Sequence, residues 1–500
     1  MTATAVEVHP GAQKFASERG KLLIAGRWVD AASGETFTTL DPSTGEEITQ
    51  IAAAKTEDVD RAVAAARTAF ESGPWARMTP DDRGKLLWTL ADLLERNTAE
   101  FAHIEALDNG KSVGMASFMD VPAAVQAFRY YAGMATKIQG NTMNLSVPYA
   151  PGARFLAYTL KQPIGVVGAI VPWNFPLMLT SWKLGPALAA GNTVVLKPAE
   201  QTSLSALRLG ALIQEAGFPD GVVNIVTGFG ETAGAAIAAH PGVDKVTFTG
   251  STEVGKLIVQ AAAGNLKRVS LELGGKSPSI IFDDADLDSA IGGAAQHIFF
   301  NHGQSCVAGS RLYAQRAVFD RVVEGTAAIA KQIKLGGAFD PDAQMGPIIS
   351  HEQLSRITDY IDHGVKEGAQ VVVGGRRRDS AGYFVEPTIM TNVHHQMKIC
   401  REEIFGPVLV CQPFDDVDEL IELANDSDYG LACALWTRDL NTANKVSRLV
   451  HAGSVYVNCH SIVDPAMPFG GFKQSGWGRE HGPDAMNMYT ETKAVCTLLA

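Results

Sequence analysis

Residues 165–198 read GVVGAIVPWNFPLMLTSWKLGPALAAGNTVVLKP, and this stretch decides the fold. It opens with a β-branched run, continues through a segment rich in Ala and Leu, and closes with a second β-branched run. A strand, a helix and a second strand in this order form a βαβ unit, whose two strands lie parallel. The stretch therefore predicts an α/β protein built on a parallel sheet.

The same alternation continues toward the carboxyl end. VVNIVTG (222–228) and KVTFTG (245–250) are strand-like runs, and each is followed by a helical segment. After Gly275 a second series begins with SIIF (279–282) and runs to SVYVN (454–458). Two doubly wound domains are the simplest arrangement of two such series.

Four segments lie outside these two series. Residues 56–138 carry apolar side chains at three- and four-residue steps, which predicts helices. NLSVPY (144–149), FLAYTLKQP (155–163) and TKAVCTLLA (492–500) are strand-like, and the last has no obvious partner. Because unpaired strand edges need covering, we expect these strands to pair across subunits of a homo-oligomer.

Composition narrows the class of protein. The chain has 500 residues, of which 46% are hydrophobic, and a formal net charge of −12. The length requires at least two domains, the hydrophobic share excludes a disordered or fibrous chain, and the acidic charge argues against nucleic-acid binding. The start lacks a signal-peptide core, and the longest apolar stretch, 163–179, is interrupted and too short for a clean membrane span. We therefore expect a cytoplasmic protein that does not bind membranes.

The six cysteines contain no CxxC pair, which argues against a zinc ribbon or a disulfide framework, and no metal is expected. Cys306 lies in NHGQSCVAGS (301–310), between a helical segment and a strand-like run. A lone cysteine is most often a small buried apolar residue, but a polar, glycine-rich loop favours a functional thiol. We interpret the neighbouring His302 as a loop residue.

Two further residues stand where strands end. Glu272 directly precedes Leu273-Gly274-Gly275, where the two glycines let another group approach closely, so it is either a general base or an ion-pair partner of Lys267 or Lys276. Asn174 is held between two prolines. Its amide is either an oxyanion donor or part of a structural turn.

Three turns could bind a dinucleotide. Gly228-Phe-Gly230-Glu-Thr-Ala-Gly234 follows a strand, but its glycine spacing is one residue too long, and no acidic residue follows about 20 positions later. Ser251 opens a helix, where it either binds a phosphate or caps the helix. Lys197 and Glu200 follow the strand TVVLK, and they either hold ribose hydroxyls or form a surface ion pair.

Seven short segments, several of which contain the residues above, occur together in one order. They are 172–176, 197–200, 248–252, 271–276, 303–306, 402–407 and 468–471. In order and rough spacing they resemble the aldehyde dehydrogenase superfamily over nearly the whole chain. The resemblance implies an NAD-binding domain (1–141 and 163–274), a catalytic domain (275–486) and a small β oligomerisation element (142–162 and 487–500), assembled into a tetramer rather than a dimer.

The resemblance also implies the roles of particular residues. Cys306 is the nucleophile, Glu272 the general base and Asn174 an oxyanion donor. NAD is held by a second set, in which Glu200 and Lys197 lie at the adenosine ribose, Ser251 at the pyrophosphate and Glu403 at the nicotinamide ribose. The full cofactor set is Ile170, Val171, Trp173, Lys197, Glu200, Gly230, Ser251, Gly274, Gln353, Arg356, Glu403 and Phe405.

The expected reaction converts an aldehyde to a carboxylic acid through a cysteine thioester. Phe175, Met178, Leu179 and Trp182 recur at helical spacing on one face, which is usually core. By resemblance this face lines a substrate tunnel, joined by Phe300, Val307, Ile462, Val463 and Phe469. No Arg or Lys belongs to this set, so we expect an apolar aldehyde. Residues 464–482 resemble bacterial phenylacetaldehyde dehydrogenases, which makes phenylacetaldehyde the first choice.

Several alternatives remain open. Broad-range and betaine-aldehyde dehydrogenases share much of segment 464–482. An acylating dehydrogenase would release the acyl group to coenzyme A, although such enzymes generally lack the carboxylate that Glu272 supplies. A non-catalytic, crystallin-like use of the fold is disfavoured by the presence of Cys306, Glu272 and Asn174 together.

Overall fold

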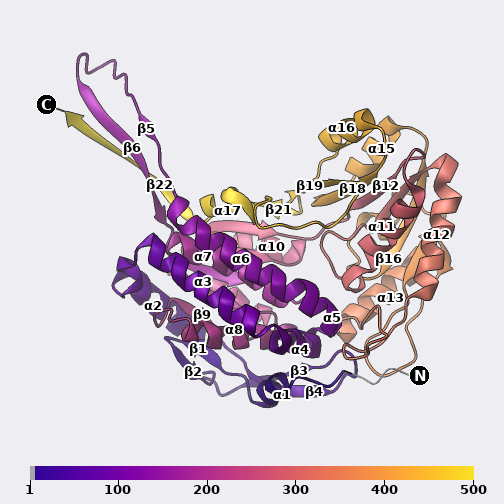
Figure 1. The fold of residues 1–500 in the computed structure, drawn as a ribbon, viewed down its shortest axis with the longest axis horizontal. Coiled ribbons are helices and arrows are strands. Elements are labelled where there is room, and N and C mark those ends of the chain that lie inside the picture. The colour runs from indigo at the N-terminus through magenta and orange to yellow at the C-terminus, as the bar shows by residue number, and fades with distance from the viewer. Residues whose placement is uncertain (1–5, 500) are drawn as a thin grey trace.

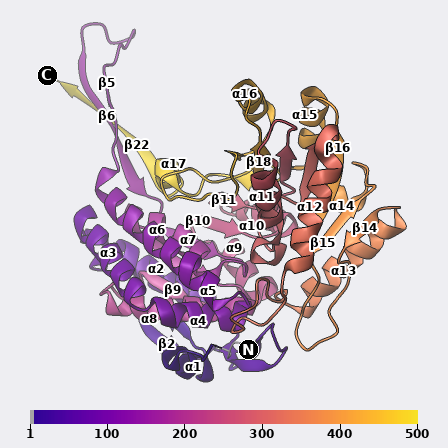
Figure 2. The same cartoon turned by 45° about the vertical axis from the view of Figure 1, so that its right-hand side comes forward.

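The computed structural model describes residues 6–499 as two α/β lobes and a projecting three-stranded arm (Figure 1). The arm carries the C-terminal strand away from both lobes, as Figures 1 and 2 show. Residues 1–5 and Ala500, which belong to the expected first domain and to the expected last strand, lie outside the described residues. Within residues 6–499 no helix is both long and apolar enough to cross a membrane.

The first lobe is built on an eight-stranded sheet in the order β2-β1-β9-β8-β7-β10-β11-β21. Its five inner strands are parallel, and β1, β2 and β21 are antiparallel additions at the two edges. The inner strands are β7 (Val166–Ile170), β8 (Thr193–Lys197), β9 (Val223–Ile225), β10 (Lys245–Thr249) and β11 (Arg268–Glu272). The βαβ unit predicted from residues 165–198 is therefore confirmed.

Helices cover both faces of this sheet because consecutive strand residues point to opposite sides. Val167 and Leu196 pack on one face with the core under α7 and α8, whereas Val166 and Val195 pack on the other with α2. The helices of this lobe are α2 (Thr56–Glu71), α3 (Pro80–Arg96), α4 (Thr98–Asn109), α6 (Val121–Met134), α7 (Pro176–Ala190), α8 (Leu204–Glu215), α9 (Ala235–Ala239) and α10 (Thr252–Ala262). The helical interpretation of residues 56–138 is confirmed, with short turns between the helices.

The second lobe contains a seven-stranded sheet in the order β14-β15-β16-β13-β12-β18-β19, parallel except for β14. Ile281 and Leu312 pack under α11 and α12, while Ile280 and Tyr313 pack under α15 and α16. The strands are β12 (Pro278–Ile281), β13 (Arg311–Gln315), β14 (Gln370–Val373), β15 (Thr388–Thr391), β16 (Val408–Phe414), β18 (Ala432–Trp436) and β19 (Ser454–Val457). The helices are α11 (Leu287–Phe299), α12 (Phe319–Gln332), α13 (His351–Lys366), α14 (Lys398–Arg401), α15 (Val417–Asn425) and α16 (Leu440–Leu449).

The lobes are joined by a strand that crosses back. After the last strand of the second sheet, β21 (Gly476–Trp477) pairs antiparallel with β11 of the first sheet. β11 ends at Glu272, so this pairing brings the segment around Gly470 to the end of that strand. The crossing places residues of both lobes around one carboxyl-edge site.

The arm corrects two expectations. The C-terminal strand β22 (Thr490–Leu499) does have a partner in its own chain, because it pairs antiparallel with β6 (Arg154–Pro163) along its whole length. The expected strand at 144–149 does not form; the third strand of the arm is the two-residue β5 (Thr142–Met143). Pro148 lacks an N–H to donate to a ladder, and the chain turns at residues 148–152 instead.

The amino-terminal elements did not follow from any pattern named above. They are α1 (Pro10–Ser17), β1 (Leu22–Ile24), β2 (Arg27–Val29), β3 (Thr36–Leu40) and β4 (Glu47–Ala52). The three-residue strands β1 and β2 extend the first sheet only because Leu23 pairs with Ile225 of β9, about two hundred positions later in the chain. Such short strands carry too little periodicity to be recognised locally.

Candidate active site

The site lies at the carboxyl edge of the first sheet, where open α/β folds bind their ligands. Asn174 follows β7, Lys197 ends β8, Ser251 follows β10 and Glu272 ends β11. Because these strands are parallel neighbours, their ends meet at one edge. The second lobe contributes Cys306, which lies on the loop between α11 and β13.

One cavity of about 450 Å³ brings the predicted catalytic and substrate residues together. Cys306, Glu272 and Asn174 all line it. So do all nine apolar residues expected to form the tunnel: Phe175, Met178, Leu179, Trp182, Phe300, Val307, Ile462, Val463 and Phe469. No Arg or Lys belongs to its described lining.

Sequence reasoning missed part of this lining. Phe118, Met119, Ala123 and Gln126 reach the cavity from a π-helical turn (Ala116–Asp120) and from α6. Phe118 is 87% exposed, so it lies at the cavity mouth. In the structure, an exposed Phe within a π-helical turn indicates a functional position, since π turns are frequent at functional sites. In the sequence, the same segment has the pattern of an ordinary amphipathic helix and gives no such indication. The remaining lining residues are Thr249, Gln296, Ser305, His460, Ser461, Pro465 and His481.

Burial keeps the Cys306 thiol protonated. Desolvation, followed by repulsion from Glu403 and Glu272, raises the pKa of Cys306 to about 12. Since the thiolate is the nucleophile, the proton must leave as the sulfur attacks. The site therefore needs a base within the same cavity.

Glu272 is placed to be that base. Its side chain is 5% exposed, and its Oε2 has no hydrogen-bond partner among residues 6–499. Burial, and then repulsion from Glu480, raises the pKa of Glu272 well above its usual range. The alternative ion pairs are wrong: Lys267 donates to the carbonyls of Ala238 and His240, and the Lys276 ammonium has no partner within the described chain.

The two glycines after Glu272 explain how the lobes approach. A Cβ on Gly274 would lie 2.2 Å from Glu403 Oε2, and a Cβ on Gly275 would lie 2.3 Å from the Cys306 carbonyl oxygen. Glu403 Oε1 accepts a hydrogen bond from Gly275 N at 2.9 Å. Burial raises the pKa of Glu403 to about 7. A side chain at Gly275 would press on the backbone of the cysteine loop, whereas one at Gly274 would displace the Glu403 carboxylate.

Asn174 is fixed by a network around its backbone and amide. Its Nδ2 donates to the Gln304 carbonyl at 3.0 Å, two residues before Cys306. The carbonyl of Asn174 accepts from Lys111 Nζ and from Asn301 Nδ2, both at 3.1 Å. The amide is therefore tied to the cysteine loop, which favours an oriented donor over a simple turn residue.

A buried charge cluster stands behind Asn174, and sequence reasoning missed it. Lys111 is fully buried, and its Nζ lies 2.9 Å from Asp120 Oδ2 and 4.5 Å from the centre of the Phe175 ring. Glu105 accepts from Leu177 N at 2.7 Å at the start of α7. In a helical sequence pattern, a lone Lys or Asp is usually interpreted as a surface charge. Only the folded structure shows that Lys111, Asp120 and Glu105 are buried together.

The expected cofactor residues fall into two groups. Lys197 Nζ donates to Glu200 Oε2 at 2.8 Å, and Ser251 Oγ accepts from Val254 N as the N-cap of α10. Gly230 begins a π-helical turn, and a Cβ there would meet nothing within 4 Å, so this edge is open. Ile170 and Val171 are buried at the end of β7.

The second group of expected cofactor residues lies around the loop that carries Glu403 and Phe405. Gln353 Nε2 donates to the carbonyls of Ile404 and Phe405, and Arg356 donates to the carbonyl of Glu403. The Phe405 ring stands 5.2 Å from that of Trp173, nearly perpendicular to it, across the lobe boundary. Gln353 and Arg356 thus act here on the backbone that carries Glu403 and Phe405.

His302 does not line this cavity. It is buried in a left-handed turn, and desolvation lowers its pKa to about 3, so it is neutral. Its ring is placed beside Gly346 rather than beside Cys306. Within residues 6–499 no three His, Cys, Asp or Glu side chains form a group that could hold a metal ion.

Comparison with known proteins agrees with this geometry. The aldehyde dehydrogenase family profile matches residues 28–495. An aldehyde dehydrogenase of Emericella nidulans is 52% identical, and the match covers 95% of this chain and 94% of that protein. The NAD⁺ complex of aldehyde dehydrogenase from Bacillus cereus superposes with a TM-score of 0.97 at 49% identity, covering 99% of this chain and 100% of that one.

A second solved structure is also similar over nearly its whole length. It is an indole-3-acetaldehyde dehydrogenase of P. syringae in complex with NAD⁺ and IAA, with a TM-score of 0.94 and 42% identity, and the match covers 98% of each chain. A cysteine, a carboxylate and an amide gathered from two lobes at one cavity, together with matches that span both lobes, lead to one assignment. The chain belongs to the aldehyde dehydrogenase family.

Proposed function

We propose that this protein oxidises an apolar, aryl-substituted aldehyde to the carboxylic acid with NAD and water, with phenylacetaldehyde as the first choice of substrate. The observation that carries the proposal is the shared cavity, in which Cys306, Glu272 and Asn174 meet an apolar wall. A nucleophile, a base and an oxyanion donor within one enclosed space are the parts that covalent aldehyde oxidation needs.

The first step forms a bond between Cys306 Sγ and the carbonyl carbon of the aldehyde. Glu272, directly or through a water molecule, takes the thiol proton as the sulfur attacks, because the thiol is protonated at rest. The carbonyl oxygen becomes an oxyanion. The electron pair for the new bond comes from sulfur, and the carbon retains its hydrogen.

Asn174 stabilises the oxyanion. One hydrogen of its Nδ2 is used by the Gln304 carbonyl, and the second has no acceptor among the described residues. The backbone N–H of Cys306 is the other donor in this proposal. Loss of one such donor typically lowers kcat by about 10²–10³.

When bound, NAD would supply the acceptor for the hydride of the adduct carbon, whose loss leaves the thioester on Cys306. Lys197, Glu200 and Ser251 would hold the cofactor at the open edge, and Glu403 would hold its nicotinamide ribose. The fit rests on the pocket that Gly274 leaves for the Glu403 carboxylate and on the unobstructed turn at Gly230. Glu200 would accept from the adenosine ribose and would repel a 2′-phosphate.

Hydrolysis completes the cycle. Glu272 first loses the thiol proton to solvent and then removes a proton from water, and the water oxygen adds to the thioester carbon. The carbon–sulfur bond breaks, and the departing sulfur takes that proton from Glu272, which releases the acid and restores the Cys306 thiol. The orphaned Oε2 of Glu272 is the group that would hold this water. A buried carboxylate of raised pKa can take up that proton readily.

The choice of an aryl substrate rests on the cavity wall. The rings of Phe175 and Phe300 are stacked with centroids 6.1 Å apart, and the Trp182 ring lies 5.3 Å from that of Phe469. Without a lining Arg or Lys, a distal carboxylate would lose its water without gaining a partner. The similar P. syringae enzyme is named for an arylacetaldehyde, which supports the same class.

A panel of aldehydes tests the proposal. The purified protein is mixed with NAD and with phenylacetaldehyde, acetaldehyde, betaine aldehyde or succinic semialdehyde, and NADH formation is followed. We expect kcat/KM for phenylacetaldehyde to exceed that for acetaldehyde by at least about tenfold. If betaine aldehyde or succinic semialdehyde is the better substrate, the aryl assignment is wrong. If no aldehyde yields NADH, the proposed reaction is wrong.

We also propose that the arm assembles the protein into a homotetramer. Leu156 and Leu160 of β6, and Leu498 of β22, are 42–66% exposed on the projecting sheet. Exposed apolar strands of this kind are usually covered by another chain. Light scattering of the wild type and of Leu156→Asp/Leu160→Asp tests this, since a wild-type monomer would contradict it.

A further inference from the structure

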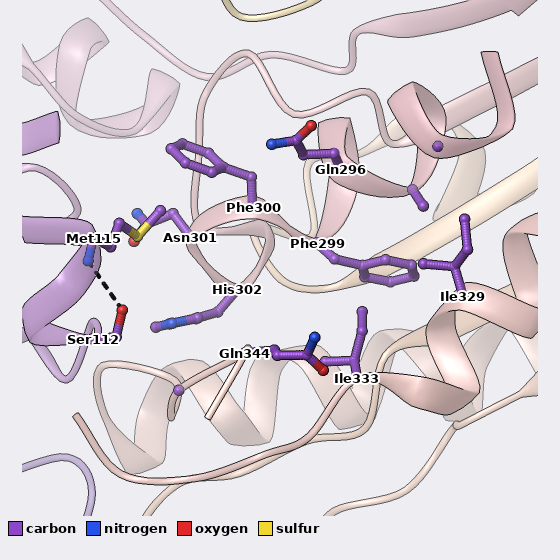
Figure 3. Close-up of a pocket in the computed structure, with 13 residues that line it drawn as sticks. Ser112, Met115, Gln296, Phe299, Phe300, Asn301, His302, Ile329, Ile333 and Gln344 are labelled. Atoms are coloured by element: carbon purple, nitrogen blue, oxygen red, sulfur yellow. Dashed lines mark hydrogen bonds between the residues drawn. The ribbon is translucent and has the colours of Figure 1, made fainter. Parts of the chain in front are cut away.

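A second cavity, of about 360 Å³, lies on the far side of the substrate cavity wall. It is a partly open cavity lined by residues of α11, α12 and the short helix α5 (Val113–Met115), and Phe300 and Gln296 contribute to both cavities. Figure 3 shows the Phe299 ring pointing toward Ile329 and Ile333, whereas Phe300 points the opposite way from the same helix end. The proposed reaction makes no use of this space.

The wall and the size of the second cavity suit a small apolar molecule. Met115, Phe299, Ile329 and Ile333 form its apolar side. Ligand pockets usually begin at about 300 Å³, and a fused two-ring molecule fits within this volume. No Arg, Lys, Asp or Glu belongs to its described lining, so a charged ligand would be buried without a partner.

Asn301 adds one specific polar group. It is 2% exposed and lines the cavity, and its Nδ2 donates to the carbonyls of Asn174 and Gln304 at 3.1 Å each. Two carbonyl acceptors require the NH₂ on that side, so the Oδ1 faces away from them. This Oδ1 has no partner among residues 6–499, and a buried acceptor left unpaired costs about 1–3 kcal/mol.

Gly292 keeps the cavity open. It lies within α11, where Gly costs about 1 kcal/mol relative to Ala, and a Cβ there would meet nothing within 4 Å. Its neighbour Gly293 differs, because a Cβ on Gly293 would lie 2.1 Å from the Trp436 ring. Packing therefore accounts for Gly293, whereas Gly292 is half-buried and borders the open space of the second cavity.

We propose that the second cavity is a ligand site for an uncharged, mainly apolar molecule that donates one hydrogen bond, with its N–H or O–H on Asn301 Oδ1. Its ring system lies among Met115, Phe299, Ile329 and Ile333. Because Asn301 also holds the carbonyls of Asn174 and Gln304, the bound molecule contacts the loop that carries Cys306 from behind.

The test compares two probes of one shape. 5-Fluoroindole carries the N–H donor, and 5-fluorobenzofuran has an oxygen in its place. The substrate cavity is first blocked by alkylating Cys306 with N-benzyl iodoacetamide, and binding is followed by ¹⁹F NMR without aldehyde or cofactor. The outcome is therefore independent of the proposed reaction. We expect the indole to bind at least about fivefold more tightly than the benzofuran.

Matched variants at one position locate the site. Gly292→Phe fills the cavity and should weaken indole binding at least about tenfold, whereas Gly292→Ala adds one methyl group and should change it less than about threefold. Thermal unfolding checks that both variants fold, and Ile329→Trp replaces Gly292→Phe if the latter does not. Equal binding of the two probes, or wild-type binding in the cavity-filled variant, would overturn the proposal.

Discussion

The ammonium group of Lys111 donates to the backbone carbonyl of Asn174 at 3.1 Å while it lies 2.9 Å from Asp120 Oδ2. Both Lys111 and Asp120 are fully buried. A buried ion pair is costly to form, and it is far more costly to break from one side. Asn174, the proposed oxyanion donor, is thus held from behind by a charge that cannot be removed without penalty.

Lys111→Met should lower the free energy of unfolding by about 3–5 kcal/mol, because the carboxylate of Asp120 is left buried without its cation. Lys111→Met/Asp120→Asn also removes the charge of Asp120 and should recover part of that loss, although the buried Glu105 carboxylate, 3.9 Å from the Lys111 ammonium, remains. Denaturant titrations of the three proteins measure the difference. A double variant less stable than Lys111→Met would contradict the pairing.

The same variant should slow turnover through Asn174. We expect kcat of Lys111→Met to fall by about tenfold to a hundredfold, less than the loss of the amide itself. In the Asn174→Ala background the extra loss should vanish, because there is no longer an amide to orient. Equal losses in both backgrounds would show that Lys111 acts elsewhere.

Alkylation of Cys306 should depend steeply on pH. Burial and the two carboxylates raise its pKa to about 12, so the thiolate fraction grows about tenfold per pH unit across the neutral range. The rate of iodoacetamide labelling, read from the Cys306 peptide by mass spectrometry, should rise accordingly from about pH 7 to about pH 9. A rate that levels off in this range would mean that the resting thiol is already ionised. Cys496, exposed on the arm, is the internal reference.

Cys306→Ala should abolish aldehyde oxidation, whereas Cys459→Ala should retain it. Glu272→Gln should slow both the attack and the hydrolysis, since the neutral amide of glutamine is too weak a base to accept the thiol or water proton. Mass spectrometry of Glu272→Gln mixed with aldehyde and NAD should then show an acyl adduct on Cys306. Finding the adduct on any of the other cysteines would refute the assigned nucleophile.

NAD should be preferred to NADP because of Glu200. A carboxylate beside a 2′-phosphate costs on the order of 1–4 kcal/mol, which corresponds to a preference of about fivefold to several hundredfold in kcat/KM. Glu200→Gln removes the charge and should narrow that preference. The measurement is kcat/KM with each cofactor in both proteins, and an unchanged ratio would exclude Glu200 as its origin.

A cation placed at the cavity mouth should widen the substrate range. Val463 lines the cavity and is 37% exposed, so an arginine there can keep its charge in contact with water. Val463→Arg should raise kcat/KM for succinic semialdehyde at least about tenfold, because the distal carboxylate gains an ionic partner. Val463→Met is the matched control, and kcat/KM for succinic semialdehyde should stay low in this variant. A similar gain in the control would mean that size, not charge, excludes the acid.

The sequence by itself determined the βαβ unit of residues 165–198, both doubly wound series, and the stripe of Phe175, Met178, Leu179 and Trp182 on one helix face. These features have local periods of two or 3.6 residues, so a short window carries them. Neighbouring glycines and prolines also marked Cys306, Glu272 and Asn174 as candidate functional residues in the sequence. Their meeting in one cavity was expected only by resemblance, because no local pattern measures the distance between two lobes.

Only the tertiary structure decided the pairings between remote segments. β22 lies against β6 of its own chain, although neither strand's sequence names its partner. The cluster of Lys111 and Asp120 and the orphaned oxygen of Asn301 depend on which side chains the fold buries together. Burial turns an ordinary surface-type charge or amide into a group that must find a partner, and that change of environment arises only when the whole chain has folded.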